Sequence, residues 1–234
     1  MTPRIDIHVY EKKYQRQLEM VQEAQISDVN KKLIRDFERI CFVQEALGKP
    51  RRIKLLSALT ILAKDYLKQD FDKVDERDMK TAVMKIENRD DYSLWTKISY
   101  RSILKKFYKW LAFGDDYAKK LEYPPIVSWI NTNARKKDRP RVQAGDIITE
   151  QEITKLINAA EHPRDRALVA MLYELGARIG EIGGLRIKDV HRDKYSYIVD
   201  LQGKTGHRTP RIVISDPYLT TWLNIHPTKN NPES

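Results

Sequence analysis

Cysteine is almost absent from the sequence, because Cys41 is the one thiol in 234 residues. A single thiol cannot close a disulfide within the chain and cannot build a multi-cysteine zinc site. We interpret Cys41 as a small buried apolar residue in a reducing compartment. No stretch approaches the ~18 consecutive apolar residues of a membrane span, and the first residues lack the pattern of a secretion signal. The sequence therefore predicts a cytoplasmic protein that does not engage membranes.

The sequence also lacks a Cys/His cluster and a glycine-rich phosphate loop, so we expect no metal and no nucleotide cofactor. Its apolar content of 41% is enough to form hydrophobic cores, in a chain with room for two domains. The net charge of +10 favours a polyanionic partner, because each Lys or Arg that neutralises a phosphate releases counterions. The alternative is a soluble basic protein without such a partner.

Apolar residues at helical spacing fill the first two thirds of the sequence. We predict an N-terminal helical arm over residues 1–26 and a helical domain over residues 27–130. Polar residues that cap helices, and glycine that ends them, mark the boundaries. The helices predicted after the arm begin at Ser27 and end at Gly48, run over residues 51–67, follow Asp75, and run over residues 93–111.

The helix predicted over residues 93–111 carries basic residues at every fourth position. Each step of four residues turns ~40° beyond a full circle, so these cations form one stripe. Like charges at this spacing cost about 0.2–0.5 kcal/mol per pair. We interpret the stripe as a phosphate-binding surface, with an ordinary solvated face as the alternative. Its members are Lys97, Arg101, Lys105 and Lys109.

A basic segment with few apolar residues follows over residues 131–147, and we predict a linker between domains. Its cations either follow a DNA backbone or belong to a solvated hinge. The residues predicted to contact DNA are Arg135, Lys136, Lys137, Arg139 and Arg141.

An α+β domain is predicted over residues 148–234. After Asp189 the apolar period changes from helical to two, which is typical of a β-hairpin. The predicted elements are a helix with the capping box 149–152, a helix from Pro163 to Gly176, hairpin strands over 195–201 and 211–215, a short helix over 218–223 and a polar tail.

Two segments of this domain combine glycine with charged side chains. In L-G-A-R-I-G-E-I-G-G-L (residues 175–185), Arg178 lies at a glycine-flanked break between helices, and Glu181 three residues later can orient it. In G-K-T-G-H-R-T-P-R (residues 203–211), Lys204 lies at the tip of the hairpin, from which it can reach a ligand. The alternatives are a structural Arg178–Glu181 pair, a helix cap at Glu181 and a solvated turn residue at Lys204.

The order of these elements resembles the tyrosine recombinases of the phage integrase family: a capping-box helix, a buried helix, a segment like T-G-x-R-x-x-E and a hairpin with G-K. The segment D-Y-S-L-W-T-K-I-S-Y-R-S-I-L-K-K-F-Y-K-W-L (residues 91–111) resembles their core-binding domain, particularly in archaeal members. The likeness covers residues 27–223. It implies a mainly α core-binding domain, a SAM-like helical bundle, followed by an incomplete α+β catalytic domain with a small β-hairpin.

In that family a tyrosine attacks the scissile phosphate, while cationic side chains stabilise the charge-rich transition state. The resemblance implies that Arg178 is the first of two arginines, that Glu181 supports it, and that Lys204 protonates the leaving oxygen. His207 and Arg208 are expected to contact the DNA backbone. The implied partner is duplex DNA, on which the protein self-associates as a dimer or tetramer.

The family pattern continues with a His-x-x-Arg motif and a tyrosine nucleophile, which this sequence does not show. His226 is followed by Pro-Thr-Lys, and Tyr218 comes directly after the hairpin, too early for the nucleophile. We therefore expect the DNA-binding portion of a recombinase, which binds duplex DNA without cleaving it. The alternatives are a non-catalytic regulator that occupies recombination sites, and a basic helical protein that binds RNA or a protein partner.

Overall fold

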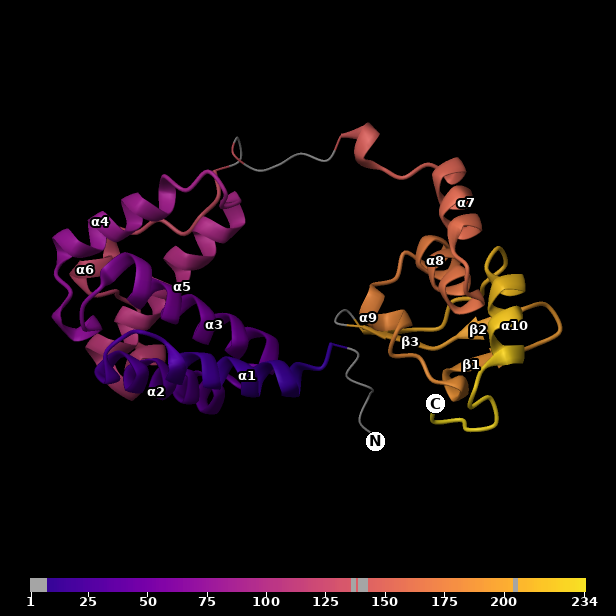
Figure 1. Cartoon of the computed structure of the whole chain (residues 1–234), viewed down its shortest axis with the longest axis horizontal. Coiled ribbons are helices and arrows are strands. Elements are labelled where there is room, and N and C mark those ends of the chain that lie inside the picture. Colours follow the sequence, from indigo (N-terminus) through magenta and orange to yellow (C-terminus); the bar gives the residue numbers. More distant parts are fainter. Residues whose placement is uncertain (1–7, 136–137, 139–142, 204–205) are drawn as a thin grey trace. The chain divides into compact units, whose positions relative to one another are not determined.

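The computed structural model describes residues 8–135, 138, 143–203 and 206–234. The chain divides into two compact units: an N-terminal unit over Val9–Pro140, and a C-terminal unit over Arg141–Ser234 to which His8 also belongs. The N-terminal unit, indigo to magenta in Figure 1, is helical, whereas the C-terminal unit, salmon to yellow, combines helices with short strands. Within the described ranges, no helix has the length and apolar character needed to cross a membrane.

Helices build the N-terminal unit, and polar side chains begin several of them. The side chain of Ser27 accepts a hydrogen bond from the Asn30 N–H, and that of Ser93 accepts one from the Thr96 N–H. The helix starts predicted after Ser27, Asp75 and Ser93 are confirmed. The helices are α1 (Tyr10–Glu23), α2 (Asp28–Glu45), α3 (Lys49–Ile61) with a π-helical continuation (Leu62–Leu67), α4 (Glu76–Glu87), α5 (Leu94–Phe113) and α6 (Pro125–Ser128).

Aromatic side chains fill the centre of this unit. Phe37, Phe71 and Phe107 are fully buried, and the ring centroid of Phe107 lies 5.2 Å from that of Phe37 and 4.7 Å from that of Phe71. Helix α1 packs against α3 and adds Tyr14 and Val21 to the same core. The helix that we predicted as part of an arm is therefore packed into the N-terminal unit.

A buried ion pair joins the first three helices. Glu38 of α2 is 4% exposed and accepts a hydrogen bond from Nε of Arg52 of α3. The hydroxyl of Tyr14 of α1 donates to the same Glu38 oxygen at 3.1 Å. The Arg52 guanidinium also lies 4.4 Å from the centroid of the Tyr14 ring. The ion pair with Arg52 thus offsets most of the free-energy cost of removing the Glu38 carboxylate from water.

The C-terminal unit packs helices against one another and against short strands. Buried side chains of α8 and α10, among them Met171 and Leu219, share a core with Val199 and Leu201 of the strands. The elements are α7 (Glu150–Ala159), α8 (Pro163–Leu175), α9 (Ile179–Ile182), β1 (Val190–Arg192), β2 (Tyr197–Val199), β3 (Leu201–Gly203), β4 (Gly206–Arg208) and α10 (Asp216–Ile225), with 3-10 turns over Ala144–Asp146 and Ile187–Asp189.

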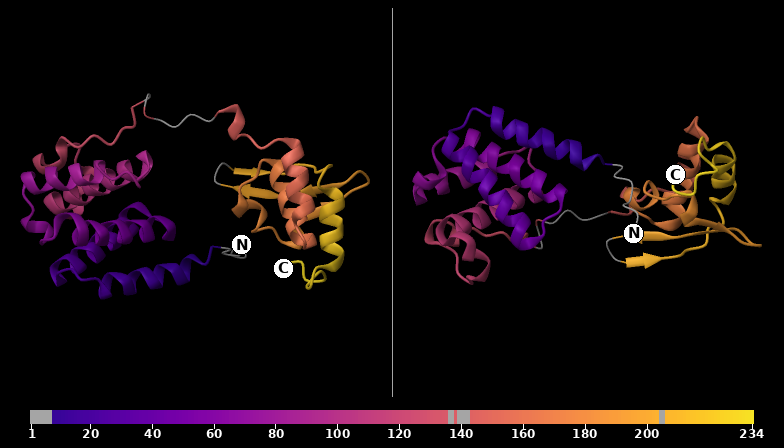
Figure 2. Two further views of the ribbon diagram at one scale, coloured as in Figure 1. Left: turned by 45° about the horizontal axis from the view of Figure 1, so that its top comes forward. Right: turned by 90° about the horizontal axis from the view of Figure 1, so that it is seen from below.

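The strands form two antiparallel ladders. Strand β1 pairs with β2, with Val190 opposite Val199, and β3 pairs with β4, with Leu201 opposite Arg208. Figure 2 shows β3 and β4 side by side, as an arm that projects from the helices of this unit. The arm carries Gly203, His207 and Arg208 of the segment that the sequence singled out.

The hairpin is displaced from its predicted position. The strand expected over residues 195–201 is divided between β2 and β3, and β1 was not expected because three residues show no clear alternation. The second strand of the hairpin was expected over residues 211–215. Arg211 and Ile212 do pair with β2, but the prediction is wrong for residues 213–215, which form no strand. The backbone N–H groups of residues 213–215 bind the carboxylate of Glu174 instead of a neighbouring strand.

The polar tail predicted after α10 folds back onto the segment before β1. The carbonyl of Ser234 accepts the Ile187 N–H at 2.9 Å, and that of Pro232 accepts the Lys188 N–H at 3.0 Å. Glu233 between them forms an ion pair with Arg186 at 2.8 Å. The last residues thus bind the backbone N–H groups of Ile187 and Lys188 and the guanidinium of Arg186.

Candidate nucleic-acid interface

Arg178 lies in the short break between α8 and α9, and glycine shapes that break. Helix α8 ends at Gly176, whose φ of 54° lies in the left-handed region that glycine adopts without a steric penalty. Arg178 then returns to an extended conformation as the N-cap residue of α9. The side chain of Arg178 is 61% exposed, so its guanidinium is open to a ligand on the outer side.

Glu181 holds Arg178 from the inner side. Glu181 is 7% exposed, and its two oxygens have different donors. Oε1 accepts from Nη1 of Arg178 at 2.8 Å, and Oε2 accepts the Arg178 backbone N–H at 3.1 Å. The guanidinium hydrogen bond first, and the backbone one second, hold the pKa of Glu181 below its ordinary value. An ionised Glu181 therefore orients Arg178 at neutral pH and leaves Nε and Nη2 for a ligand.

The β3–β4 hairpin runs directly beside Glu181. Arg208 of β4 is 49% exposed and places Nη2 3.8 Å from Oε2 of Glu181, so two arginines share one carboxylate. A Cβ atom on Gly203 of β3 would lie 2.0 Å from Oε1 of Glu181, so the strand approaches this closely because residue 203 has no side chain. Lys204 lies outside the described residues. The structure thus brings Arg178, Glu181 and Arg208 together.

His207 lies on the same hairpin but faces a different carboxylate. Its Nε2 is 3.8 Å from Oδ1 of Asp200, and Oδ2 of Asp200 is 3.1 Å from Nε2 of His191 on β1. These three side chains come together only through the pairing of the strands, so no local pattern could have indicated His191 or Asp200. Among the described residues, no group of three or more His, Cys, Asp or Glu side chains has the arrangement to hold a metal ion. DNA contact by His207 and Arg208 stays a prediction.

The first two cations of the α5 stripe are bound to the end of α4. The ammonium of Lys97 donates to the carbonyl of Glu87 at 2.6 Å. Nε of Arg101 lies 3.4 Å from the Glu87 carboxylate, and the Arg101 side chain is 15% exposed. Lysine and arginine commonly bind the last carbonyls of a helix in this way. These two side chains therefore have a structural role in joining α4 to α5.

The other two cations of the stripe surround Tyr123. Lys105 donates to the carbonyl of Ile130 at 2.8 Å, and Lys109 donates to that of Lys120 at 2.6 Å. Their ammonium groups lie 4.5 and 4.8 Å from the centroid of the Tyr123 ring. All four stripe residues are half-buried rather than fully solvent-facing. Their contact with DNA stays a prediction, and the structure adds an internal role that the spacing did not indicate.

The linker cations are mostly outside the described part of the chain. Nε of Arg135 donates to Oδ2 of Asp138 at 2.6 Å, and the Arg135 side chain is 69% exposed. Contact of the linker with a DNA backbone stays a prediction. The cations outside the described residues are Lys136, Lys137, Arg139 and Arg141.

A groove of about 400 Å³ lies between α3 and α5 in the N-terminal unit. Lys54 and Ser57 line it from α3, and Trp95 and Ser99 line it from α5. Trp95 is 53% exposed. The side chains of Lys54, Ser57 and Ser99 make no hydrogen bond to any part of the chain that the structure describes. The groove thus presents polar groups that remain available to a partner.

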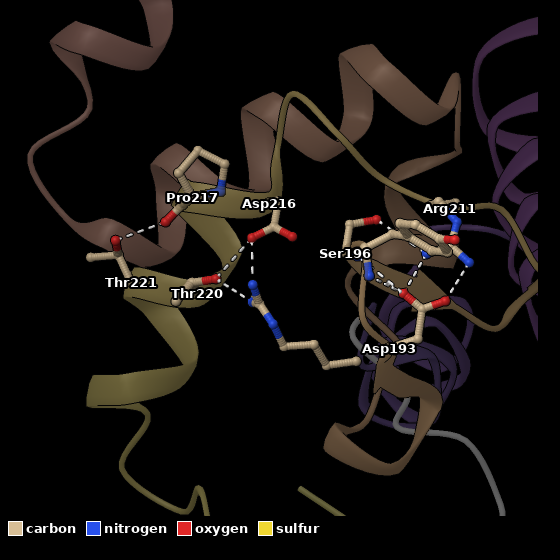
Figure 3. Close-up of polar contacts among 9 residues, drawn as sticks. Asp193, Ser196, Arg211, Asp216, Pro217, Thr220 and Thr221 are labelled. Carbon is tan, nitrogen blue, oxygen red and sulfur yellow. Dashed lines mark hydrogen bonds and ion pairs between the residues drawn. The ribbon is translucent and has the colours of Figure 1, made fainter.

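A second polar cluster fixes the return of the chain from the hairpin to α10 (Figure 3). Asp193 accepts hydrogen bonds from both Nη groups of Arg211 and from two backbone N–H groups. The Arg211 hydrogen bonds, followed by the backbone donors, hold the pKa of Asp193 far below its ordinary value. Arg192 separately reaches Oδ1 of Asp216 on α10 at 3.4 Å. These charged contacts connect the β1–β2 ladder to the segment that leads into α10 and to α10 itself.

Glu174, near the end of α8, holds the same return segment. Its Oε1 accepts the N–H groups of Val213 at 2.6 Å and Ile214 at 3.1 Å. Its Oε2 accepts the N–H of Ser215 at 2.8 Å and the Ser215 hydroxyl at 2.5 Å. Burial raises the pKa of Glu174, but these donors together outweigh burial and leave the pKa below its ordinary value. One ionised carboxylate therefore replaces the strand partner that residues 213–215 lack.

Residues 146–233 match the model of the phage integrase family. The chain is similar to two curated proteins named tyrosine recombinase XerA: that of Pyrococcus horikoshii is 31% identical over 79 residues, and that of Pyrococcus furiosus is 30% identical over 99 residues. These alignments cover 33% and 41% of this chain, and 27% and 34% of the relatives, so the chain spans about a third of the length of the relatives it matches. The family match includes Arg178, Glu181 and the β3–β4 hairpin.

Proposed function

The chain belongs to the phage integrase family of tyrosine recombinases, and from that membership we propose that it binds duplex DNA. Arg178 and Arg208 hold a DNA phosphate at the edge of the hairpin. The process that this DNA binding serves is site-specific recombination, in which DNA is cut and rejoined through a phosphotyrosine intermediate.

The arrangement around Glu181 carries this proposal. Because Glu181 binds the inner side of the Arg178 guanidinium, the remaining N–H groups of Arg178 have a defined direction. A guanidinium can bind two oxygens of one phosphate through parallel hydrogen bonds. Arg208 adds a second exposed cation beside the first. Such fixed donors stabilise the charge that develops on phosphoryl oxygens during transfer.

The groove between α3 and α5 is the DNA-contacting surface that we propose for the N-terminal unit. Lys54 supplies a cation for a phosphate, and Ser57 and Ser99 supply hydroxyl groups that either donate or accept. Trp95 offers an apolar surface for contact with a base or sugar. The α5 stripe is a less suitable surface, because each of its cations already has an internal partner.

The experiment is a fluorescence-anisotropy titration of the 234-residue chain with a labelled duplex at several salt concentrations. With about six phosphate contacts, affinity should fall about a thousandfold between roughly 50 and 200 mM salt. Arg178→Ala, Arg208→Ala and Lys54→Ala should each reduce the slope of log affinity against log salt by about one. Glu161 offers a control at an exposed position, where Glu161→Gln should leave that slope nearly unchanged.

A flat salt titration would contradict the proposal, because phosphate contacts cannot form without releasing counterions. Unchanged slopes for both Arg178→Ala and Arg208→Ala would show that DNA binds elsewhere on the chain. A reduced slope for Lys54→Ala with no change for Arg178→Ala would restrict binding to the N-terminal unit.

A further inference from the structure

The carboxylate of Glu181 is enclosed by two separate parts of the C-terminal unit. On the α9 side, Oε1 and Oε2 bind the guanidinium and the backbone N–H of Arg178. On the hairpin side, Oε2 faces Arg208 at 3.8 Å, and Oε1 occupies the space that a side chain at Gly203 would take. Glu181 is therefore the point at which the hairpin and the Arg178 segment meet.

Of the two hairpin residues beside Glu181, Gly203 is the one at which a larger side chain would clash. A Cβ atom there would lie 2.0 Å from Oε1 and 2.8 Å from Cδ of Glu181, which is far inside van der Waals contact. The atoms in the way belong to the end of a flexible side chain, so the clash is relieved when Glu181 rotates and the backbone stays in place. Such a rotation breaks the 2.8 Å hydrogen bond from Arg178 Nη1. The absence of a side chain at residue 203 thus keeps the carboxylate in place beneath Arg178.

Arg208 acts on the other oxygen. At 3.8 Å its guanidinium is a close ion-pair partner, although the contact is longer than a good hydrogen bond. Glu181 is 7% exposed, so solvent screens this attraction less than it would on an open surface. Arg208 therefore favours the carboxylate position in which Oε2 also accepts the Arg178 N–H.

We propose that Gly203 and Arg208 are positioning residues, which hold the Glu181 carboxylate beneath Arg178 and so make the orientation of Arg178 depend on the hairpin. Displacement of β3 or β4 releases Glu181, and the Arg178 guanidinium then becomes mobile. The inference rests on the proposed function only for the identity of the ligand that Arg178 binds. The coupling between the hairpin and the orientation of Arg178 is a property of the protein without DNA.

The test is nitrogen-15 NMR of the arginine side chains in the 234-residue chain, with Arg178→Lys used to assign the Arg178 signals. In the parent protein, the hydrogen bond to Glu181 should slow rotation of the guanidinium and separate its Nη signals. Gly203→Ala should abolish that separation while the melting temperature stays near that of the parent. Gly145→Ala is the matched control, because a Cβ there meets no atom within 4 Å.

Arg208 is tested in the same spectra, with Arg192→Ala as the control for loss of an exposed arginine from the other ladder of the same unit. Arg208→Ala should shift the Arg178 Nε signal and reduce the separation of the Nη signals, and Arg208→Lys should restore part of both. A merely structural arginine would lower the melting temperature without this rescue. If Gly203→Ala does not fold, Arg208→Ala decides the question alone.

Parent-like Arg178 signals in Gly203→Ala and Arg208→Ala would overturn the proposal, even in a protein that binds DNA. The reverse outcome separates the two conclusions: if the Arg178 signals change as expected and the parent protein does not bind duplex DNA, the coupling stands and the proposed function fails.

Discussion

Glu174→Gln should destabilise the C-terminal unit, because both oxygens of Glu174 accept hydrogen bonds from residues 213–215. A glutamine retains one acceptor and must turn its NH₂ group toward backbone N–H groups at the other. Hydrogen bonds to a charged group are worth about 1.5–3 kcal/mol each, and a partial rearrangement recovers some of them, so we expect a loss of about 2–3 kcal/mol. For a domain of this size, that loss corresponds to a melting temperature lower by about 10–20 °C.

The assay is thermal unfolding by circular dichroism over a range of pH, with Glu161→Gln as an exposed control in the same unit. The pKa of Glu174 in the folded protein lies below its ordinary value of 4.5. Its contribution to the free energy of unfolding is therefore fully present above the unfolded-state value and is lost as pH falls through the folded-state value. The difference between parent and Glu174→Gln should be largest at neutral pH and should shrink below about pH 4.5. An equal difference at pH 7 and pH 3, or no difference at pH 7, would refute the reasoning.

Three further predictions concern the ion pair in the N-terminal unit and the chemistry at Arg178. Arg52→Met should lower the free energy of unfolding by about 3–5 kcal/mol in denaturant titrations, because Glu38 is left buried and charged, and adding Glu38→Leu should recover most of the loss. The exposed pair of Arg39 should contribute less than about 1 kcal/mol in the same titrations, so a similar loss in Arg39→Ala would contradict this account. The described residues that line the pocket at Arg178 are His8, residues 178–181, Gln202 and Gly203, and none of them is a tyrosine. A nicked suicide substrate should therefore give no covalent adduct on a denaturing gel, and a protease-sensitive shifted band would contradict this. In a form that cleaves DNA, Arg178→Ala should slow cleavage by a factor of about a hundred to a thousand, or about 2.7–4 kcal/mol, and Arg178→Lys should restore little of the rate. Equal losses of DNA binding and of cleavage would instead show that Arg178 only binds DNA and does not stabilise the transition state.

Local sequence patterns predicted most of the helices because their causes are local. An N-cap hydroxyl such as that of Ser27 or Ser93 binds an N–H only three residues away. The spacing of Arg178 and Glu181 likewise places both on one turn, where the structure shows their hydrogen bond. The prediction of the helices and the pairing of these two residues needed no information about the rest of the fold.

The α5 stripe shows where a local pattern was insufficient. Spacing by four places Lys97, Arg101, Lys105 and Lys109 along one side of a helix, but it does not say what lies against that side. The structure places carbonyl groups and Tyr123 there. These internal partners come from distant segments of the packed fold, which the spacing of the charges cannot indicate. The sequence pattern therefore predicted a more exposed cationic surface than the structure shows.

The helical character of the N-terminal unit, the glycine-flanked position of Arg178 and its support by Glu181 all follow from local patterns of residues. The contacts across strands and between elements depend on the packed fold: Gly203 and Arg208 at Glu181, His191 and His207 at Asp200, and residues 213–215 at Glu174. Helix contacts repeat with a fixed local period, whereas strand register and the partners of unpaired backbone groups are set by how distant segments pack.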